Sequence, residues 1–263
     1  MIKLLITDVD GTLVKESHNN LNPEYFTVIT QLKAKGIQVV AASGRPLSSM
    51  ERIFAPVASD IWFISDCGVT VKTGDQIVNH GIIPEDWRRE LWHDISQVPT
   101  ADGMLCGAEQ IYIPKKDSPM CKIVRDQYEM SICYQNGWED FPEEPCGKLS
   151  LFCPENVEAL GRQYLWEKWQ DRLHLVISGE WWLDFTMPHV NKGYALEQLL
   201  QEHGYTPEEV LATGDNMNDI EMLTVAGTAL AVSTAREEVK AVADRVIGSY
   251  EEDAVLEEWK KLL

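Results

Sequence analysis

The strongest structural signal in the chain lies near its N-terminus, in Lys3-Leu4-Leu5-Ile6-Thr7-Asp8-Val9-Asp10-Gly11-Thr12-Leu13. It begins with a short apolar run of the kind that forms a buried strand, and the run ends in two carboxylates and a glycine. Asp8 and Asp10 are two positions apart, so their side chains point the same way in an extended segment. A strand that brings acidic residues to its carboxyl end predicts a ligand site at the edge of a parallel sheet.

Outward from this stretch, short apolar or β-branched runs alternate with segments whose apolar residues recur at helical spacing. Such alternation predicts an α/β fold with a Rossmann-like parallel-sheet core and helices on both faces. The expected strands are residues 3–8, 37–42, 61–65, 210–213, 227–232 and 245–247, with a hairpin at 69–78, and the expected helices are 23–35, 192–202, 219–225 and 251–263.

The middle of the chain has a different composition, because seven of the nine Trp lie between positions 87 and 182. We therefore expect a discontinuous core domain of residues 1–81 and 189–263, interrupted by an inserted α+β cap domain of residues 82–188. Within the insertion, helices are expected at 84–97 and 156–170, strands at 110–113, 148–153, 173–178 and 181–186, and irregular structure at 131–146.

The charge balance narrows the range of partners. The 263 residues include 42 Asp and Glu against 23 Lys and Arg, a net charge of −19. Binding to nucleic acid or an anionic membrane needs clustered basic residues, so both are excluded as partners. The sequence has no apolar run long enough for a membrane-spanning helix, and its first apolar run is too short for a signal peptide. The six scattered Cys are expected to be reduced thiols, and we expect a cytoplasmic monomer or small homo-oligomer.

Polar and acidic residues follow two further expected strands. Ser43-Gly44-Arg45 follows the second strand, Gly214-Asp215-Asn216-Met217-Asn218-Asp219 follows a later one, and Lys192 begins the helix before that later strand. The carboxyl ends of parallel strands meet at one edge, so these residues are expected to lie near Asp8 and Asp10. Carboxylates crowded in this way repel one another unless a cation joins them. Mg²⁺ fits, because it binds one or two carboxylates together with waters and a substrate phosphate.

These segments resemble the four motifs of the haloacid dehalogenase-like phosphohydrolases, and more narrowly of their Cof-type branch with a C2 (type IIB) cap. Residues 8–13 are similar to the first motif, Ser43-Gly44-Arg45 to the second, Lys192-Gly193 to the third and residues 214–219 to the fourth. The resemblance implies a Mg²⁺-dependent phosphatase that acts through an aspartyl-phosphate intermediate. It implies a small phosphorylated metabolite as substrate, with a sugar phosphate as the leading candidate.

The resemblance also implies a role for each residue. Asp8 is the expected nucleophile, and Asp10 is the expected general acid and base. Asp8 and Asp215 would bind Mg²⁺ through carboxylates and Asp10 through its backbone carbonyl, and Asp219 would support the metal site. Thr12 is expected to be a loop or helix-capping residue. The expected substrate-binding and phosphate-binding residues are Ser43, Gly44, Lys192, Asn218, Gly11 and Arg45. Asn218 alternatively orients the metal-binding loop.

Several alternatives stay open. Arg45 is alternatively a surface charge or a loop anchor. Asp66 stands where the family has Asn, and a role in the turn competes with a role in substrate contact. A phosphomutase or phosphotransferase of the same superfamily is the second hypothesis. A phosphate-sensing module is the third, and Asp10 argues against it, because a switch needs no acid for a leaving group.

Overall fold

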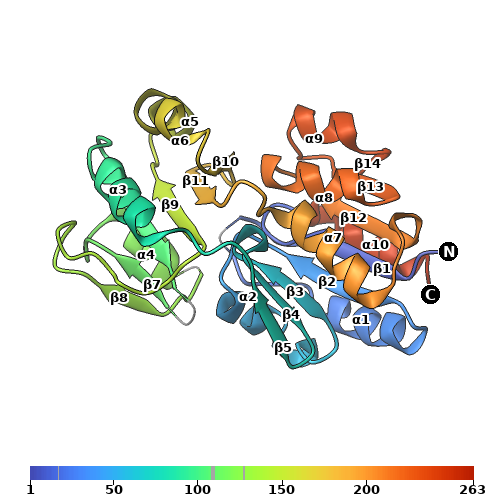
Figure 1. Cartoon of the computed structure of the whole chain (residues 1–263). Coiled ribbons are helices and arrows are strands. Elements are labelled where there is room, and N and C mark those ends of the chain that lie inside the picture. Colours follow the sequence, from blue (N-terminus) through green and yellow to red (C-terminus); the bar gives the residue numbers. More distant parts are fainter. Residues whose placement is uncertain (17, 108–109, 127) are drawn as a thin grey trace. The chain divides into compact units, whose positions relative to one another are not determined.

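The computed structural model describes residues 1–263 except 17, 108, 109 and 127. It divides into two compact units, of which the first comprises Met1–Val78 and Asn191–Leu263 and the second comprises Asn79–Val190 (Figure 1). Each unit is built around a sheet of its own.

The first unit contains an eight-stranded sheet. The strands from β14 to β3 pair in parallel, and β4 runs antiparallel to β3. The α/β fold class is therefore confirmed. In sheet order the strands are β14 (Arg245–Ile247), β13 (Thr228–Val232), β12 (Val210–Gly214), β1 (Leu4–Asp8), β2 (Gln38–Ala42), β3 (Trp62–Ser65), β4 (Thr70–Thr73) and β5 (Gln76–Asn79).

Before the second unit, successive strands are added from β1 through β2 and β3 towards one edge of the sheet. After the second unit, they are added from β12 through β13 and β14 towards the other edge. Right-handed crossovers from β1 to β2 and from β12 to β13 therefore place their helices on opposite faces. In accord with this, α1 packs beside α10, whereas α8 packs beside both α7 and α9. The helices are α1 (Glu24–Ala34), α2 (Leu47–Ile53), α7 (Lys192–His203), α8 (Ile220–Val225), α9 (Glu237–Val242) and α10 (Ala254–Lys260).

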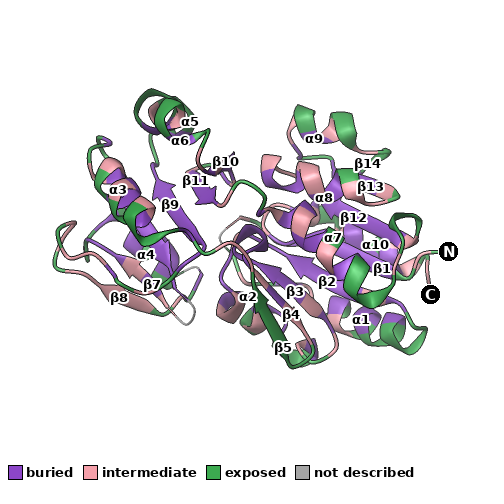
Figure 2. Ribbon diagram, in the orientation of Figure 1, coloured by how far each residue is buried: buried purple, intermediate pink, exposed green. Residues whose placement is uncertain are grey.

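The central strands of the first unit form its core. All five residues of β1 and all five of β12 are buried, as expected for parallel strands covered on both faces (Figure 2). On the α1 side, the Tyr25 and Trp259 rings meet edge to face with centroids 5.5 Å apart. The loops that follow β1, β2 and β12 therefore begin at strands in the buried centre of the sheet.

The second unit contains a six-stranded sheet. Its pairs are antiparallel except for β7 and β8, which run in parallel. In sheet order its strands are β10 (His174–Ile177), β11 (Trp182–Thr186), β9 (Lys148–Phe152), β6 (Asp102–Cys106), β7 (Ile111–Ile113) and β8 (Ile132–Tyr134), and its helices are α3 (Glu85–Ser96), α4 (Pro119–Asp126), α5 (Val157–Gly161) and α6 (Glu167–Trp169).

Side chains of β9 alternate between the two faces of this sheet. Leu149 and Leu151 belong to a core that includes Trp92 of α3 and Trp169 of α6. Phe152 belongs to a second core that is built largely on α4. Most of the Trp side chains in this unit are therefore packing residues.

The structure corrects the expected secondary structure at several places. Residues 131–146 were expected to be irregular, yet β8 lies within them. The strand β6 was not expected, because its sequence begins with Asp102 and Gly103, two residue types that are depleted in strands. It forms because it is paired on both sides, with β9 and β7. Between α5 and α6 the helix contains a π-helical turn, Arg162–Trp166.

Among the helices that the structure describes, none is long and apolar enough to cross a membrane. All six Cys lie in the described part of the chain, and none of them forms a disulfide.

Candidate active site

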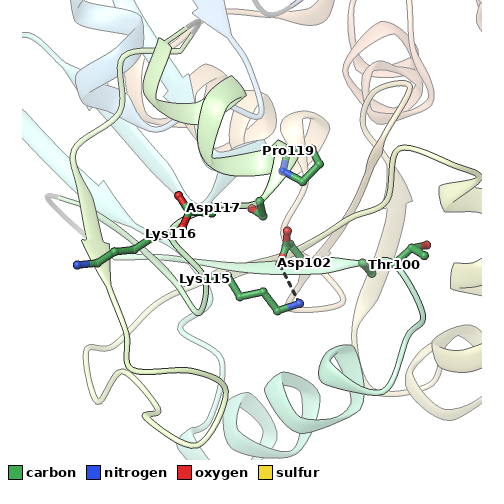
Figure 3. A pocket seen from close by; sticks show the side chains of 8 residues that line it. Thr100, Asp102, Lys115, Lys116, Asp117 and Pro119 are labelled. Atoms are coloured by element: carbon green, nitrogen blue, oxygen red, sulfur yellow. Dashed lines mark ion pairs between the residues drawn. The ribbon is translucent and has the colours of Figure 1, made fainter.

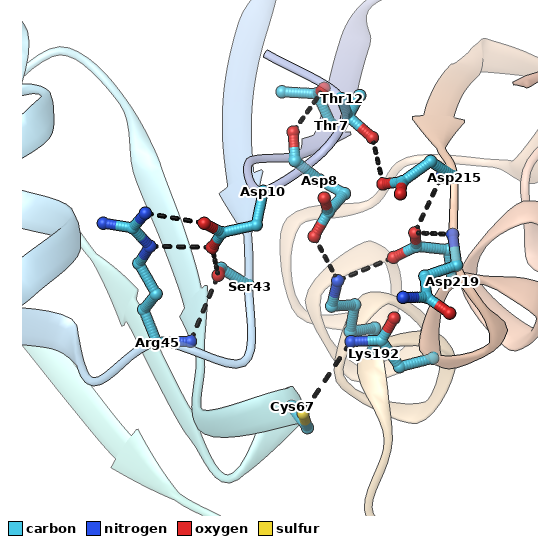
Figure 4. A network of polar contacts seen from close by, with 12 residues as sticks. Thr7, Asp8, Asp10, Thr12, Ser43, Arg45, Cys67, Lys192, Asp215 and Asp219 are labelled. Atoms are coloured by element: carbon cyan, nitrogen blue, oxygen red, sulfur yellow. Dashed lines mark hydrogen bonds and ion pairs between the residues drawn. The ribbon is translucent and has the colours of Figure 1, made fainter. Parts of the chain in front are cut away.

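The candidate site lies at the carboxyl edge of the first unit's sheet. Asp8 is the last residue of β1, and its strand is paired with β12 on one side and β2 on the other. Gly214 is the last residue of β12, and Asp215 follows it. Ser43 directly follows β2. The order of strands therefore brings together segments that are far apart in the sequence (Figure 4).

Lys192 is the centre of the buried charge network. It is the first residue of α7 and is fully buried. Its Nζ lies 2.5 Å from Asp8 Oδ1 and 2.6 Å from Asp219 Oδ1. A lysine at a helix N-terminus opposes the helix dipole, and a buried ammonium is costly without partners. The two carboxylates offset both penalties and raise the pKa of Lys192 against the opposing effect of burial, so it stays charged.

The side chain of Asp219 holds the backbone of the loop that follows β12. Asp219 Oδ2 accepts hydrogen bonds from the backbone N–H groups of Asp215 and Asn216, at 2.9 and 3.1 Å. Thr12 Oγ donates to Asp215 Oδ1 at 2.7 Å. Gly11 has φ +84°, and a Cβ there would lie 2.4 Å from Asp215 Oδ2. Thr12 thus orients a candidate metal ligand, a role that was missed because it was expected only to cap a loop or helix.

The carboxylates of this site fit a cation. Asp8, Asp215 and Asp219 each offer an oxygen, and these oxygens lie within 4.8 Å of one another. Asp8 Oδ2 is buried and accepts no hydrogen bond from the described residues. Burial raises the pKa of Asp8 to about 7, with Asp219 and Asp10 adding to the rise and Lys192 opposing it. Burial and the neighbouring Asp8 and Asp219 raise the pKa of Asp215 as well. Such crowding favours a bound divalent cation, which would stabilise the ionised forms.

Asp10 lies outside this three-carboxylate cluster. Its carboxylate is bound by Arg45, with Nε to Oδ2 at 2.7 Å and Nη2 to Oδ1 at 2.6 Å. Ser43 Oγ donates to Asp10 Oδ2 at 3.4 Å and accepts from the Arg45 N–H at 3.1 Å. The structure therefore places Ser43 and Arg45 around the expected acid, Asp10. Metal binding through the Asp10 backbone carbonyl stays a prediction.

The remaining expected residues lie around the same edge. Asn218 is buried, and its Nδ2 is 4.0 Å from Cys67 Sγ. Gly44 is partly buried between Ser43 and Arg45. Sequence reasoning missed Cys67, which lies in a loop close enough to Lys192 to raise that lysine's pKa. No sequence signal distinguished Cys67 from the other thiols.

Asp66, the departure from the family pattern, is buried in the turn Asp66–Gly68. Asp66, Cys67 and Gly68 have φ values of 51°, 58° and 101°. At Gly68 a Cβ would lie 2.3 Å from the carbonyl oxygen of Asn191. A glycine is therefore required where this turn approaches the start of α7.

The second unit has a pocket of about 440 Å³ (Figure 3). Asp102 and Lys115, two of its lining residues, form an ion pair at 3.6 Å. Asp102 is buried, and the lysine offsets its charge. Thr100, Lys116, Asp117 and Pro119 also line it.

An aspartate at the end of a central parallel strand, paired with a buried lysine and grouped with two further carboxylates, is a site suited to phosphoryl chemistry in an α/β protein. The chain belongs to the haloacid dehalogenase-like hydrolases, since the sequence model of that family matches residues 5–258. The chain is a hydrolase that acts on phosphoric monoesters. The expected family and enzyme class are thus confirmed.

Individual relatives match along almost their whole length. The Escherichia coli 5-amino-6-(5-phospho-D-ribitylamino)uracil phosphatase YbjI is 28% identical over 262 residues, which cover 100% of this chain and 96% of that protein. A crystal structure from Eubacterium rectale has a TM-score of 0.86 at 34% identity and covers 100% of this chain and 99% of that one. A subclass IIB sugar phosphatase has a TM-score of 0.85 at 21% identity, with 99% and 98% covered, and this likeness shows the fold alone.

Proposed function

We propose that the protein is a Mg²⁺-dependent phosphatase that hydrolyses a small phosphorylated metabolite through an aspartyl-phosphate on Asp8. The observation that carries the proposal is the Asp8 carboxylate. One oxygen is held by Lys192 at 2.5 Å, and the other is buried without a hydrogen bond from the described residues. A carboxylate oxygen that accepts no hydrogen bond from the described residues, at the end of a strand paired on both sides, supports a role for Asp8 in attacking phosphorus.

In the first step, Asp8 forms a bond to phosphorus while the bond from phosphorus to the leaving oxygen breaks. The electron pair stays on the leaving oxygen, which takes a proton from the carboxylic acid form of Asp10. In the second step, a water molecule gives its proton to Asp10 and attacks phosphorus, and the bond to Asp8 breaks. Phosphate leaves, and both aspartates return to their starting states.

Asp8, Asp215 and Asp219 are the residues that would hold Mg²⁺, with Asp219 acting in support because its oxygens already accept hydrogen bonds. The ion supplies positive charge that offsets repulsion between a carboxylate and a phosphate dianion. Lys192 supplies a further positive charge at the same place, and fixed charges of this kind are often the largest contribution to catalysis. Ser43, Gly44, Gly11 and Asn218 stay the proposed contacts to the phosphoryl oxygens.

We propose a sugar phosphate as the substrate class and the second unit as the cap that selects it. Sequence relatives named as phosphatases of small phosphorylated compounds support a small phosphorylated metabolite as the substrate. The insertion between the second and third motifs supports the role of the second unit as the cap. A cytoplasmic location, where such metabolites occur, belongs to the same proposal.

A panel of phosphorylated metabolites tests this function. Purified protein is assayed for phosphate release with Mg²⁺ and again after EDTA, with Asp8→Asn as the matched control. The proposal expects one group of sugar phosphates to be hydrolysed, with no release by Asp8→Asn or without metal. Equal release by Asp8→Asn would contradict the role of Asp8. Full activity after EDTA would contradict the metal requirement.

A further inference from the structure

The Asp10–Arg45 contact bears on how the expected acid is held. The side chain of Arg45 is only 2% exposed, and its fork binds both oxygens of the Asp10 carboxylate (Figure 4). A two-point contact between a guanidinium and a carboxylate fixes the plane of both groups, which a single hydrogen bond does not. Arg45 therefore determines where the Asp10 oxygens point.

Other groups hold the guanidinium itself. Nη1 donates to Asn19 Oδ1 at 2.5 Å, and Nη2 donates to the carbonyl oxygen of His18 at 2.8 Å. The backbone of Arg45 is also fixed, because its N–H donates to Ser43 Oγ and its carbonyl accepts from the Asp66 N–H at 3.0 Å. Arg45 thus joins the segment after β1 to the loop after β2.

The same contacts argue against the role that the sequence suggested for Arg45. A phosphoryl group bound by the Arg45 fork would compete with Asp10 for the same donors. A positive charge beside the nucleophile does not require Arg45, because Lys192 Nζ already contacts the Asp8 carboxylate. We infer that Arg45 is a positioning residue, which orients Asp10 through its carboxylate and is itself oriented by Asn19, and that it does not bind the phosphoryl group. The inference rests on the proposed function, in which Asp10 protonates the leaving oxygen.

Leaving groups of different acidity separate the two roles. A phenolate with two nitro groups departs without a proton, whereas an unsubstituted phenolate needs one as its bond to phosphorus breaks. We would compare phenyl phosphate with 2,4-dinitrophenyl phosphate, using wild-type protein with Mg²⁺ and the variants Arg45→Met, Arg45→Lys and Asn19→Ala. Arg52→Met, a change at an exposed arginine of α2, is the matched control.

The inference expects Arg45→Met to lower kcat/KM by about 10²-fold for phenyl phosphate and by less than about threefold for the dinitrophenyl ester. Asp10→Asn should show the same dependence on leaving group. Arg45→Lys and Asn19→Ala should show it more weakly, and Arg52→Met should resemble wild type. Inhibition by inorganic phosphate should be unchanged in Arg45→Met. If Arg45→Met does not fold, the dependence of kcat/KM on the leaving group in Arg45→Lys and Asn19→Ala tests the inference.

An equal loss on both esters, with weaker inhibition by inorganic phosphate, would overturn the inference and make Arg45 a phosphate ligand. That result would leave the proposed function intact. Wild-type protein that releases phosphate neither from these esters nor from the panel of phosphorylated metabolites with Mg²⁺ would instead overturn the proposed function and, with it, the inference.

Discussion

Lys192 Nζ lies 2.5 Å from Asp8 Oδ1, although the two residues are 184 positions apart in the sequence. Both side chains are buried, at 0% and 6% exposure, so the contact is a charge pair removed from water. Removing Lys192 leaves the Asp8 carboxylate buried without its positive partner, and breaking a buried pair in this way costs about 3–5 kcal/mol.

Lys192→Met should lower kcat at least about 10²-fold, because the positive charge that offsets repulsion between Asp8 and phosphate is lost. It should also lower the melting temperature of metal-free protein, with partial recovery on addition of Mg²⁺. Steady-state kinetics and thermal unfolding measure the two effects. Lys261→Met is the control, since Lys261 is exposed and pairs with Glu258 at the surface. Activity within about twofold of wild type in Lys192→Met would contradict the account.

The stability of the metal-free protein should fall as pH rises. The pKa of Asp8 is raised from an ordinary value of 3.8 to about 7, so the folded state keeps a proton that the unfolded state has lost. The Asp8 carboxyl group therefore contributes stability below pH 3.8, and this contribution is lost as pH rises from 3.8 to about 7. Asp215 shifts in the same direction. Melting temperatures of EDTA-treated protein, measured across the window, should show the fall.

Two comparisons isolate that effect from other titrating groups. Asp8→Asn cannot lose the proton, so its melting temperature should fall less than that of wild type over the same window. Mg²⁺ should restore wild-type stability most at the upper end, where the carboxylates are ionised. An identical pH profile for wild type and Asp8→Asn would show that Asp8 is not shifted.

Thr12→Val should weaken Mg²⁺ binding without unfolding the protein. Thr12 Oγ donates to Asp215 Oδ1 at 2.7 Å, and groups that orient a metal ligand typically contribute about 10–100-fold to affinity. The Mg²⁺ concentration for half-maximal activity should rise, while kcat at saturating Mg²⁺ should change less. Thr30→Val, on the exposed side of α1, is the matched control. An unchanged Mg²⁺ requirement would mean that Thr12 only fastens the loop.

The fold of the first unit could be predicted from sequence because its signals are local. Parallel strands covered on both faces appear as continuous apolar runs, and the helices α1, α7, α8 and α10 have apolar residues at helical spacing. The short helices α2 and α9 were not expected. The strand β6 and the helix α4 of the second unit could not be predicted in this way. Strand β6 contains Gly103 and begins with Asp102, and its pairing with β9 and β7 overrides that weak preference.

Some features of the candidate site could likewise be predicted from the sequence, and others could not. Asp8, Asp215 and Asp219 follow from their places at strand ends, because parallel strands deliver those ends to one edge. The partner of Arg45 does not follow from its place. A guanidinium reaches either a phosphate or a carboxylate, and the choice depends on how the segment containing His18 and Asn19 folds back. No spacing in the sequence encodes that contact.

Phosphorylation of Asp8 during turnover can be detected by mass spectrometry of the phosphoenzyme. Asp10→Asn protein is mixed with a 2,4-dinitrophenyl ester and Mg²⁺, quenched in acid and digested, with Asp8→Asn treated in parallel. We expect one added phosphoryl group on the peptide that contains Asp8, accumulating because the second step lacks its base, and none in Asp8→Asn. Turnover without any phosphorylated Asp8, or a phosphoryl group on another residue, would show that Asp8 is not the nucleophile.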